Sequence, residues 1–132
     1  MPIDYVEIVD PDSGIIAEFH NYVLIDAFPD KYVREDISIL RKNIMVRNWT
    51  DGNEICRYHL YVACKDGQVV GGVSFYFFSF GSYAIGMGSY IAVCKEHRKG
   101  GIGRKLIDIR DQALLMDAYE FNCQIKGLVI QV

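Results

Sequence analysis

The chain has 132 residues, a length that suits one compact domain, and 51% of them are hydrophobic, enough for a buried core. Charged residues make up 23%, the ordinary level of a globular protein, which excludes an intrinsically disordered chain. The net charge of −3 argues against a nucleic-acid partner, because such partners select a basic surface.

The chain contains four cysteines, with no C-x-x-C pair and no histidine at metal-ligand spacing. Free thiols and no metal site are therefore expected, as in a reducing cytoplasm. We expect no signal peptide, because residues 1–5 contain no basic region followed by an apolar run. The uncharged stretch 67–94 is long enough to suggest a membrane span, but its glycines, aromatic and β-branched residues favour a buried β-hairpin. We expect a cytoplasmic protein without a membrane segment.

In the first half, Asp10 and Pro11 are typical of a helix start, with aspartate as N-cap and proline as the first helical residue. The apolar residues that follow recur at helical spacing. The predicted elements in chain order are a strand at Tyr5–Val9, a helix from Pro11 to Ala27, a helix at Arg34–Lys42, and a loop or irregular hairpin at Asn48–Asn53.

In the second half, Asp66 and Gly67 separate two apolar runs, which is a strong hairpin signal. The predicted elements are strands at Arg57–Cys64, Val69–Phe80 and Tyr83–Val93, a helix at Gly100–Tyr119, and a last strand at Cys123–Val132. A helical crossover makes the last strand parallel to Tyr83–Val93. We predict a single α+β domain over 1–132, with a mixed, mostly antiparallel sheet and helices on both faces.

The run Arg98–Gly103 is predicted to be an anion-binding turn that opens the helix. Backbone N–H groups in the first turn of a helix lack partners and lie at the positive end of its dipole, so they favour a phosphate. Glycines let the backbone approach the anion closely, and they fall at positions 100, 101 and 103, among the basic residues 98, 99, 104 and 105. A tight strand-to-helix turn without a ligand is the alternative. Neither a Walker loop nor a dinucleotide fingerprint fits.

These residues resemble the central motif of the GNAT acyltransferases, in which Gln or Arg is followed by x-x-Gly-x-Gly/Ala. Arg98, Gly101 and Gly103 match it, after the strand 91–93 and within the run 96–106. The segment 62–72 is similar to the strand pair that precedes the motif in the family, and the order of elements agrees. The specific part of the resemblance covers 57–132.

The resemblance implies acetyl-CoA as cosubstrate. It implies that the strand 89–93 bulges and splays from the last strand, that backbone groups of Ile91 and Val93 pair with pantetheine, and that N–H groups from Lys99 to Arg104 take the pyrophosphate. An acceptor amine then attacks the thioester directly. The cofactor-binding residues implied in this way are Ile91, Ala92, Val93, Arg98, Lys99, Gly100, Gly101, Ile102, Gly103 and Arg104.

The chain departs from the family in its catalytic residues. Some members place a glutamate base eleven residues before the motif, where this chain has Met87, and no carboxylate lies on that strand. Ser89 is a poor base by itself. Glu54 or His59 could act through water, although a solvated loop charge and an ordinary strand residue are the simpler interpretations. The catalytic residues therefore stay unassigned.

The family also continues with another helix and strands, so the chain is expected to be truncated or unusually short, and its apolar last strand to offer an edge for a homodimer. We expect an N-acetyltransferase that transfers an acetyl group from acetyl-CoA to a primary amine of a small molecule or peptide. A degenerate module that holds acyl-CoA without turnover is one alternative, and a purely structural role without coenzyme A affinity is another.

Overall fold

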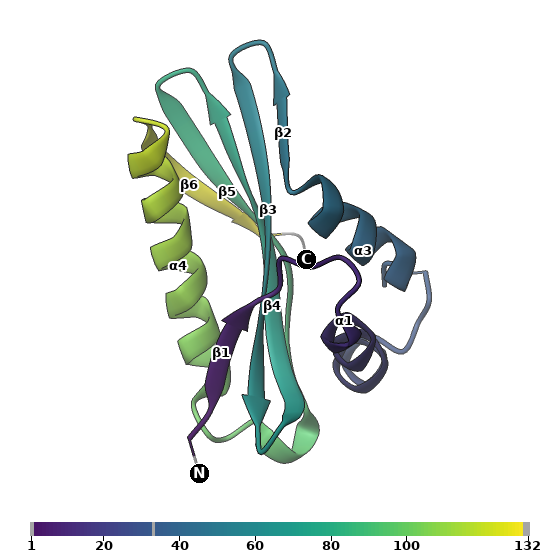
Figure 1. Ribbon diagram of the computed structural model, residues 1–132. Helices are drawn as coiled ribbons and strands as arrows, with labels where there is room; N and C mark the ends of the chain where they lie inside the picture. Colours follow the sequence, from purple (N-terminus) through teal and green to yellow (C-terminus); the bar gives the residue numbers. More distant parts are fainter. Residues whose placement is uncertain (1, 33, 131–132) are drawn as a thin grey trace.

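The computed structural model describes residues 2–32 and 34–130. A twisted sheet lies between two helical layers, with α4 on one face and α1 and α3 on the other (Figure 1). The elements are β1 (Asp4–Glu7), α1 (Gly14–Glu18), the π-helical η1 (Phe19–Leu24), α2 (Ile25–Ala27), α3 (Ile37–Val46), β2 (Asn48–Asp51), β3 (Glu54–Lys65), β4 (Gln68–Phe80), β5 (Tyr83–Val93), the 3-10 helix η2 (Lys95–His97), α4 (Ile102–Glu120) and β6 (Gln124–Ile130).

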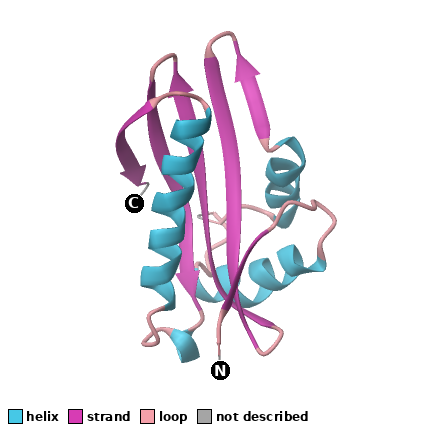
Figure 2. Ribbon diagram, turned by 60° about the vertical axis from the view of Figure 1, so that its left-hand side comes forward, coloured by secondary structure: helices cyan, strands magenta, loops and turns pink. Residues whose placement is uncertain are grey.

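The sheet has six strands in the order β1-β3-β4-β5-β6, and β2 pairs with the other end of β3. All pairings are antiparallel except β5 with β6, which is parallel from Tyr83 opposite Gln124 to Gly88 opposite Ile130. Helix α4 makes the crossover between these two strands and lies along the sheet (Figure 2). The predicted α+β class and the parallel last strand are confirmed. The predicted strand end at residues 131–132 lies outside the described residues.

The first helical segment begins later than predicted. Ser13 is the N-cap, since its side chain accepts the N–H of Ile15, and the helix starts at Gly14. Asp10 instead accepts the N–H of Asp12 within the preceding turn. Aspartate and serine both serve as N-caps, and here the serine lies closer to the apolar stripe.

The second helix is also displaced from the predicted range Arg34–Lys42, because Asp36 accepts the N–H of Ser38 and caps a helix that starts at Ile37. Arg34 and Glu35 therefore lie in the loop between α2 and α3. This shift frees the side chain of Glu35 to face the sheet rather than follow the helix surface.

Local turn chemistry was predicted correctly at two hairpins. Asp66 and Gly67 join β3 to β4 with positive φ angles of 53° and 79°, the conformation of a type I′ turn. The segment predicted as a loop or irregular hairpin contains β2, which pairs with β3 from Asn48 opposite Arg57 to Asp51 opposite Glu54. Gly52, at φ 62°, lies in the turn between them.

Two hydrophobic cores cover the two faces of the sheet. Under α1 and α3, a Cβ at Gly72 would collide with the ring of Phe19, so glycine lets this helical layer lie close to the strands. Under α4, Phe75 and Phe77 are completely buried and Leu106 packs with them. Within the described residues, no helix is long and apolar enough to cross a membrane.

Candidate active site

The strand β5 carries a β-bulge within the segment 89–93, where the family resemblance implies one. Ser74 pairs with Tyr90 and Phe75 with Gly88, so Ser89 is the extra residue. At the bulge, the backbone N–H of Tyr90 donates to the side-chain oxygen of Ser74, at 3.1 Å, and Ser74 is fully buried. A bulge bends its strand and turns the following residues, which sets the direction of 89–93.

Beyond the bulge, β5 presents a row of backbone groups away from β4. The N–H of Cys94 donates to Val70 O at 2.8 Å, which marks this pair as hydrogen bonded. Bonded and non-bonded pairs alternate in an antiparallel ladder, so Ala92 also faces β4 while Ile91 and Val93 direct their N–H and C=O groups outward. β6 pairs with β5 only up to Gly88 within the described residues. The outward edge at 91–93 is therefore without a described partner strand.

The predicted anion-binding turn lies at the end of this edge. Gly101 is the N-cap of α4 and has a φ of 82°, a left-handed conformation that side chains disfavour. The N–H groups of residues 101–104 have no acceptor among the described residues, as expected of the first turn of a helix. Gly103 approaches the side chain of Val93, which brings the turn and the strand edge together.

The charge of the turn suits a pyrophosphate. Lys99, Arg104 and Lys105 are exposed, and none of the three forms an ion pair within residues 2–32 and 34–130. The Arg98 Nε donates to Val93 O at 2.9 Å, and its Nη2 lies 3.8 Å from Asp26 Oδ2. Unpaired N–H donors at the positive end of a helix dipole, with free cations beside them, are the donor set that binds phosphate.

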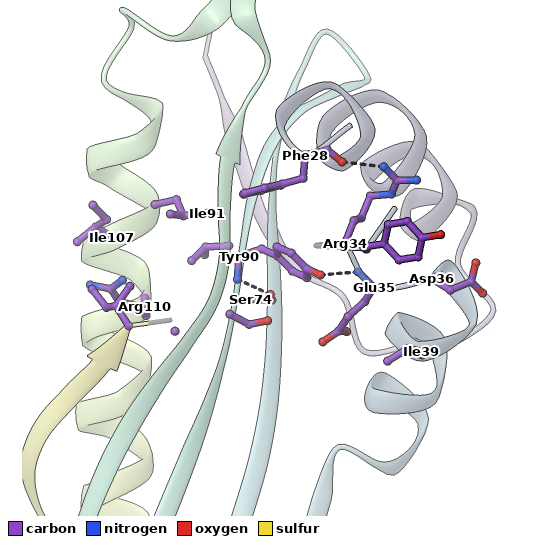
Figure 3. Close-up of a pocket in the computed structure, with 15 residues that line it drawn as sticks. Phe28, Arg34, Glu35, Asp36, Ile39, Ser74, Tyr90, Ile91, Ile107 and Arg110 are labelled. Atoms are coloured by element: carbon purple, nitrogen blue, oxygen red, sulfur yellow. Dashed lines mark hydrogen bonds between the residues drawn. The ribbon is translucent and has the colours of Figure 1, made fainter. Parts of the chain in front are cut away.

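A cleft of about 750 Å³ begins at the β5 bulge and opens between the two helical layers (Figure 3). Residues of β5 form its floor, α4 contributes one wall and the loop before α3 the other. The lining residues from these three parts include Ser89, Tyr90 and Ile91, then Ile107 and Arg110, then Arg34, Glu35 and Asp36. The backbone edge at 91–93 thus adjoins the cleft at Ile91 and the glycine turn at Gly103.

Long-range hydrogen bonds hold the loop that forms the second wall. The backbone N–H of Glu35 donates to the hydroxyl of Tyr90 at 2.6 Å. Arg34 Nη1 donates to the carbonyl oxygens of Phe28 and Pro29, at 2.7 and 3.2 Å. Tyr90 also packs against the ring of Phe28, with centroids 5.5 Å apart. These contacts fix the loop against β5, as Figure 3 shows.

Sequence reasoning missed Glu35, Tyr90 and Arg110, which line the cleft. Glu35 and Tyr90 are 55 positions apart, so no local spacing signals their contact. Arg110 follows the helical pattern of α4 and its guanidinium is buried, with Nε donating to Asp111 at 3.2 Å. Nothing in the helical period distinguishes it from a surface arginine.

Of the residues considered as bases, only Ser89 lines the cleft. Met87, at the position of the family's glutamate, and the alternatives Glu54 and His59 lie outside it. Met87, opposite Tyr76, lies on the face away from α4, beside a second hollow of about 220 Å³ that it lines with Trp49, Phe78 and Ile85. Glu54 lines the same hollow at the far end of β3 and is exposed.

His59 is buried under α4 rather than in the cleft. Its Nδ1–H donates to Glu7 Oε2 at 2.5 Å and its Nε2–H to Asp117 Oδ2 at 2.6 Å. Burial alone lowers the pKa of His59, but the hydrogen bonds to Asp117 and Glu7 outweigh it and raise the pKa. Since both nitrogens donate to carboxylates, His59 is a cation in this network and has no free nitrogen to act as a base.

The sequence profile of the acetyltransferase (GNAT) domain matches residues 56–127, more than half of the chain. The chain therefore belongs to the GNAT acetyltransferase domain family, and its sequence and fold are those of a GNAT-type N-acetyltransferase. Among the curated proteins, none matches it in sequence.

Solved structures share the fold at low sequence identity. An aminoglycoside acetyltransferase from an uncultured soil metagenomic sample, in complex with sisomicin, has a TM-score of 0.73 at 17% identity, over 98% of this chain and 77% of that one. The ribosomal-protein-alanine N-acetyltransferase from Brucella melitensis biovar Abortus has a TM-score of 0.64 at 23% identity, over 99% and 80%. A GNAT family acetyltransferase from Staphylococcus aureus has a TM-score of 0.60 at 16% identity, over 100% and 87%.

Proposed function

We propose that this protein is a cytoplasmic N-acetyltransferase that transfers the acetyl group of acetyl-CoA to a primary amine by direct attack. The observation that carries the proposal is the continuity of the outward backbone edge at Ile91 and Val93 with the unpaired N–H groups that begin at Gly101. A polar arm ending in a pyrophosphate fits that combination, because the arm needs strand-like partners and the anion needs a helix N-terminus.

In this proposal, the N–H groups of 101–104 bind the pyrophosphate, with Lys99 and Arg104 adding charge beside them. The backbone of Ile91 and the N–H of Val93 pair with the pantetheine arm. The Val93 carbonyl accepts from Arg98 Nε, and the other donors of Arg98 stay beside the arm. Acetyl-CoA supplies an activated thioester, which the arm's path along β5 delivers to the cleft near Ser89. The protein then needs only to align the amine with that carbonyl.

The acceptor enters from the side of the loop before α3. This wall contains the acidic side chains of Glu35 and Asp36 and the aromatic rings of Phe28 and Tyr32. Such a wall favours a cationic amine over an anionic one. The aminoglycoside and ribosomal-protein enzymes that share the fold indicate two classes of acceptor to try, a small polyamine-like molecule and a peptide N-terminus.

Binding is the first test. Acetyl-CoA at a hundredfold over its dissociation constant should stabilise the folded protein by about 2.7 kcal/mol through mass action, which a thermal melt detects. Thiol release with a panel of amines, containing an aminoglycoside, short peptides and lysine, then measures turnover. A melt that neither acetyl-CoA nor coenzyme A changes would refute the proposal.

The substitution Gly101→Glu tests the pyrophosphate position. A side chain at φ 82° is strained, and a carboxylate would repel the anion, so binding should weaken by more than 100-fold. Gly14→Glu is the matched control, because it adds the same charge in the first turn of α1, where a Cβ meets no atom within 4 Å. Equal affinities for acetyl-CoA in the two variants would place the anion elsewhere.

The alternative of a binding module without turnover has one observation in its favour. Met87 stands where some family members have a glutamate, and no carboxylate lies on β5. Stabilisation by acetyl-CoA together with no thiol release above the rate in buffer, across the whole amine panel, would favour the binding module over the enzyme.

A further inference from the structure

The cleft contains one carboxylate that the structure leaves without a partner. Glu35 lines the cleft from the loop before α3, and its side-chain oxygens form no hydrogen bond or ion pair with the described residues, although its backbone N–H is held by Tyr90. In Figure 3 the carboxylate extends from the loop toward the strands, beneath the Tyr90 hydroxyl. Because its backbone is held in place and its carboxylate oxygens have no partner, Glu35 is positioned to bind a ligand.

Phenol groups from three strands lie within electrostatic range of this carboxylate. Burial, and after it the Glu35 carboxylate, raises the pKa of Tyr76 to about 12. Burial also raises the pKa values of Tyr58 and Tyr90, with a smaller contribution from the charge of Glu35. The Tyr58 hydroxyl is buried and has no hydrogen-bond partner within residues 2–32 and 34–130. The phenols near the Glu35 carboxylate are therefore neutral and do not compensate its negative charge.

The charged groups near the loop are already engaged with other atoms. Arg34 directs its guanidinium to two backbone carbonyls. Asp36 caps α3, and its hydrogen bonds to Ser38, with a smaller contribution from the charge of His20, lower its pKa. Arg110, across the cleft on α4, donates to Asp111 through its Nε alone, at 3.2 Å. Burial raises the pKa of Glu35, the direction that brings a carboxyl nearer to the range of a general base at neutral pH.

From this geometry we infer that Glu35 binds the acceptor as a primary ammonium ion and removes its proton before attack on the thioester. The inference rests on the proposed acetyl transfer and assigns the base that β5 lacks. Glu35 lies on the loop that forms the acceptor wall, and its partner Tyr90 lies next to the bulge residue Ser89 and to Ile91 on the floor of the same cleft. The carboxylate and the proposed position of the acetyl group thus share one space.

The step is balanced in protons. The ammonium ion gives one proton to the Glu35 carboxylate, and the neutral amine attacks the thioester carbon, so that a C–N bond forms and the C–S bond breaks. The remaining excess proton on nitrogen passes to the departing thiolate, which leaves as the thiol. Glu35 then releases its proton to solvent, and the products are an amide, coenzyme A and one proton.

The same wall defines the class of acceptor. Phe28 and Tyr90 pack against each other beside Glu35, and Tyr32, whose ring centroid lies 5.4 Å from Lys31 Nζ, also lines the cleft. A carboxylate flanked by aromatic rings binds an ammonium ion through charge and cation–π attraction, and it favours apolar or aromatic carbon next to the amine. Phenethylamine is therefore a suitable probe, and 2-phenylethanol is its uncharged counterpart.

Glu35→Gln tests the role in catalysis, because the amide keeps the shape of the side chain and the backbone bond to Tyr90. With the best acceptor from the amine panel, kcat/KM at pH 7 should fall about 100-fold or more. The remaining rate should rise with pH as neutral amine accumulates, and the acidic limb that belongs to Glu35 should disappear. Glu35→Asp should recover part of the rate.

Glu54→Gln is the control, because Glu54 is an exposed carboxylate at the other hollow. It lies opposite Phe80, which is six residues further along β4 than Ser74, so it is remote from the cleft. It should keep the rate and pH profile of the original protein. A Glu35→Gln variant that keeps both kcat/KM and the acidic limb would overturn the inference, whatever the effect of Glu54→Gln.

A second measurement separates this inference from the proposed function. With the protein saturated by coenzyme A, phenethylammonium should shift the side-chain carboxyl ¹³C resonance of Glu35, and 2-phenylethanol should not. This shift without thiol release from any amine would support ammonium binding at Glu35 and count against acetyl transfer. No thiol release and no shift would overturn both, and thiol release with an unshifted Glu35 resonance would overturn the inference alone.

Discussion

Two acidic side chains lie on opposite faces of the sheet, and they differ in their partners. Asp117, on the buried side of α4, accepts from His59 at 2.6 Å and from Arg57 at 2.8 Å, and so has both oxygens engaged. Glu35, in the loop before α3 on the other face, is half-buried and has no partner for its oxygens among the described residues. A buried carboxylate whose oxygens have partners can support the folded state, whereas a buried carboxylate without partners destabilises it.

The paired carboxylate holds the fold together. Asp117 connects the C-terminal part of α4 to His59 and Arg57 on β3, and Glu7 extends the network to β1. The unpaired carboxylate costs stability and is kept next to a cleft, a combination that is typical of residues that act on a ligand. We therefore expect substitutions on the α4 face to change stability and those at Glu35 to change chemistry.

The largest expected effect on stability is that of Asp117→Ala. The change leaves the His59 imidazolium and the Arg57 guanidinium without their shared partner, and removing one side of a buried ion pair costs about 3–5 kcal/mol. Asp108→Ala, on an exposed position of the same helix, should change the free energy of unfolding by less than about 0.5 kcal/mol. Urea denaturation measures both. Similar midpoints for the two variants would mean that the network is not structural.

The next effect is a pH dependence that originates in His59. Its pKa is raised in the folded state, so its contribution to stability is fully present below the unfolded pKa, near 6.5, and is lost as pH rises through the folded value. The titratable groups that face it are Glu7, Asp117 and the stacked ring of Tyr61. The melting temperature should therefore fall as the pH rises above about 6.5. In His59→Gln this fall should be absent, and an identical fall in both proteins would assign it to another group.

The smallest expected effect is that of Glu35→Gln on stability. Because the pKa of Glu35 is raised by burial, its ionised form destabilises the folded state above the unfolded pKa. The amide should leave the melting temperature unchanged or slightly higher at pH 8, with a difference that shrinks toward pH 4. Solvent reaches this side chain, so the difference should be small. A lower melting temperature at pH 8 would show that the carboxylate supports the fold and would weaken the contrast with Asp117.

Much of the fold could be predicted because its signals are local. The turn at Asp66 and Gly67 and the opening of α4 after Gly101 each depend on a few neighbouring residues. The helix boundaries at Ser13 and Asp36 were missed, since several residues in each stretch can serve as a cap and tertiary packing selects one. The assignment of the ten cofactor-binding residues, the continuation of the chain past Val132 and the pairing of two chains through the last strand stay predictions.

The sequence by itself determined the order of the elements and the cationic helix start, because dihedral preferences and helix-end donors are properties of short segments. The bulge in β5 was expected only from the resemblance to the GNAT family. Only the tertiary structure decided which carboxylates are paired. Tyr90 reaches the backbone of Glu35 across 55 positions, and His59 reaches Asp117 across 58, so both contacts arise from sheet pairing and helix packing. Those distant contacts give one acid a structural role and leave the other free in the cleft.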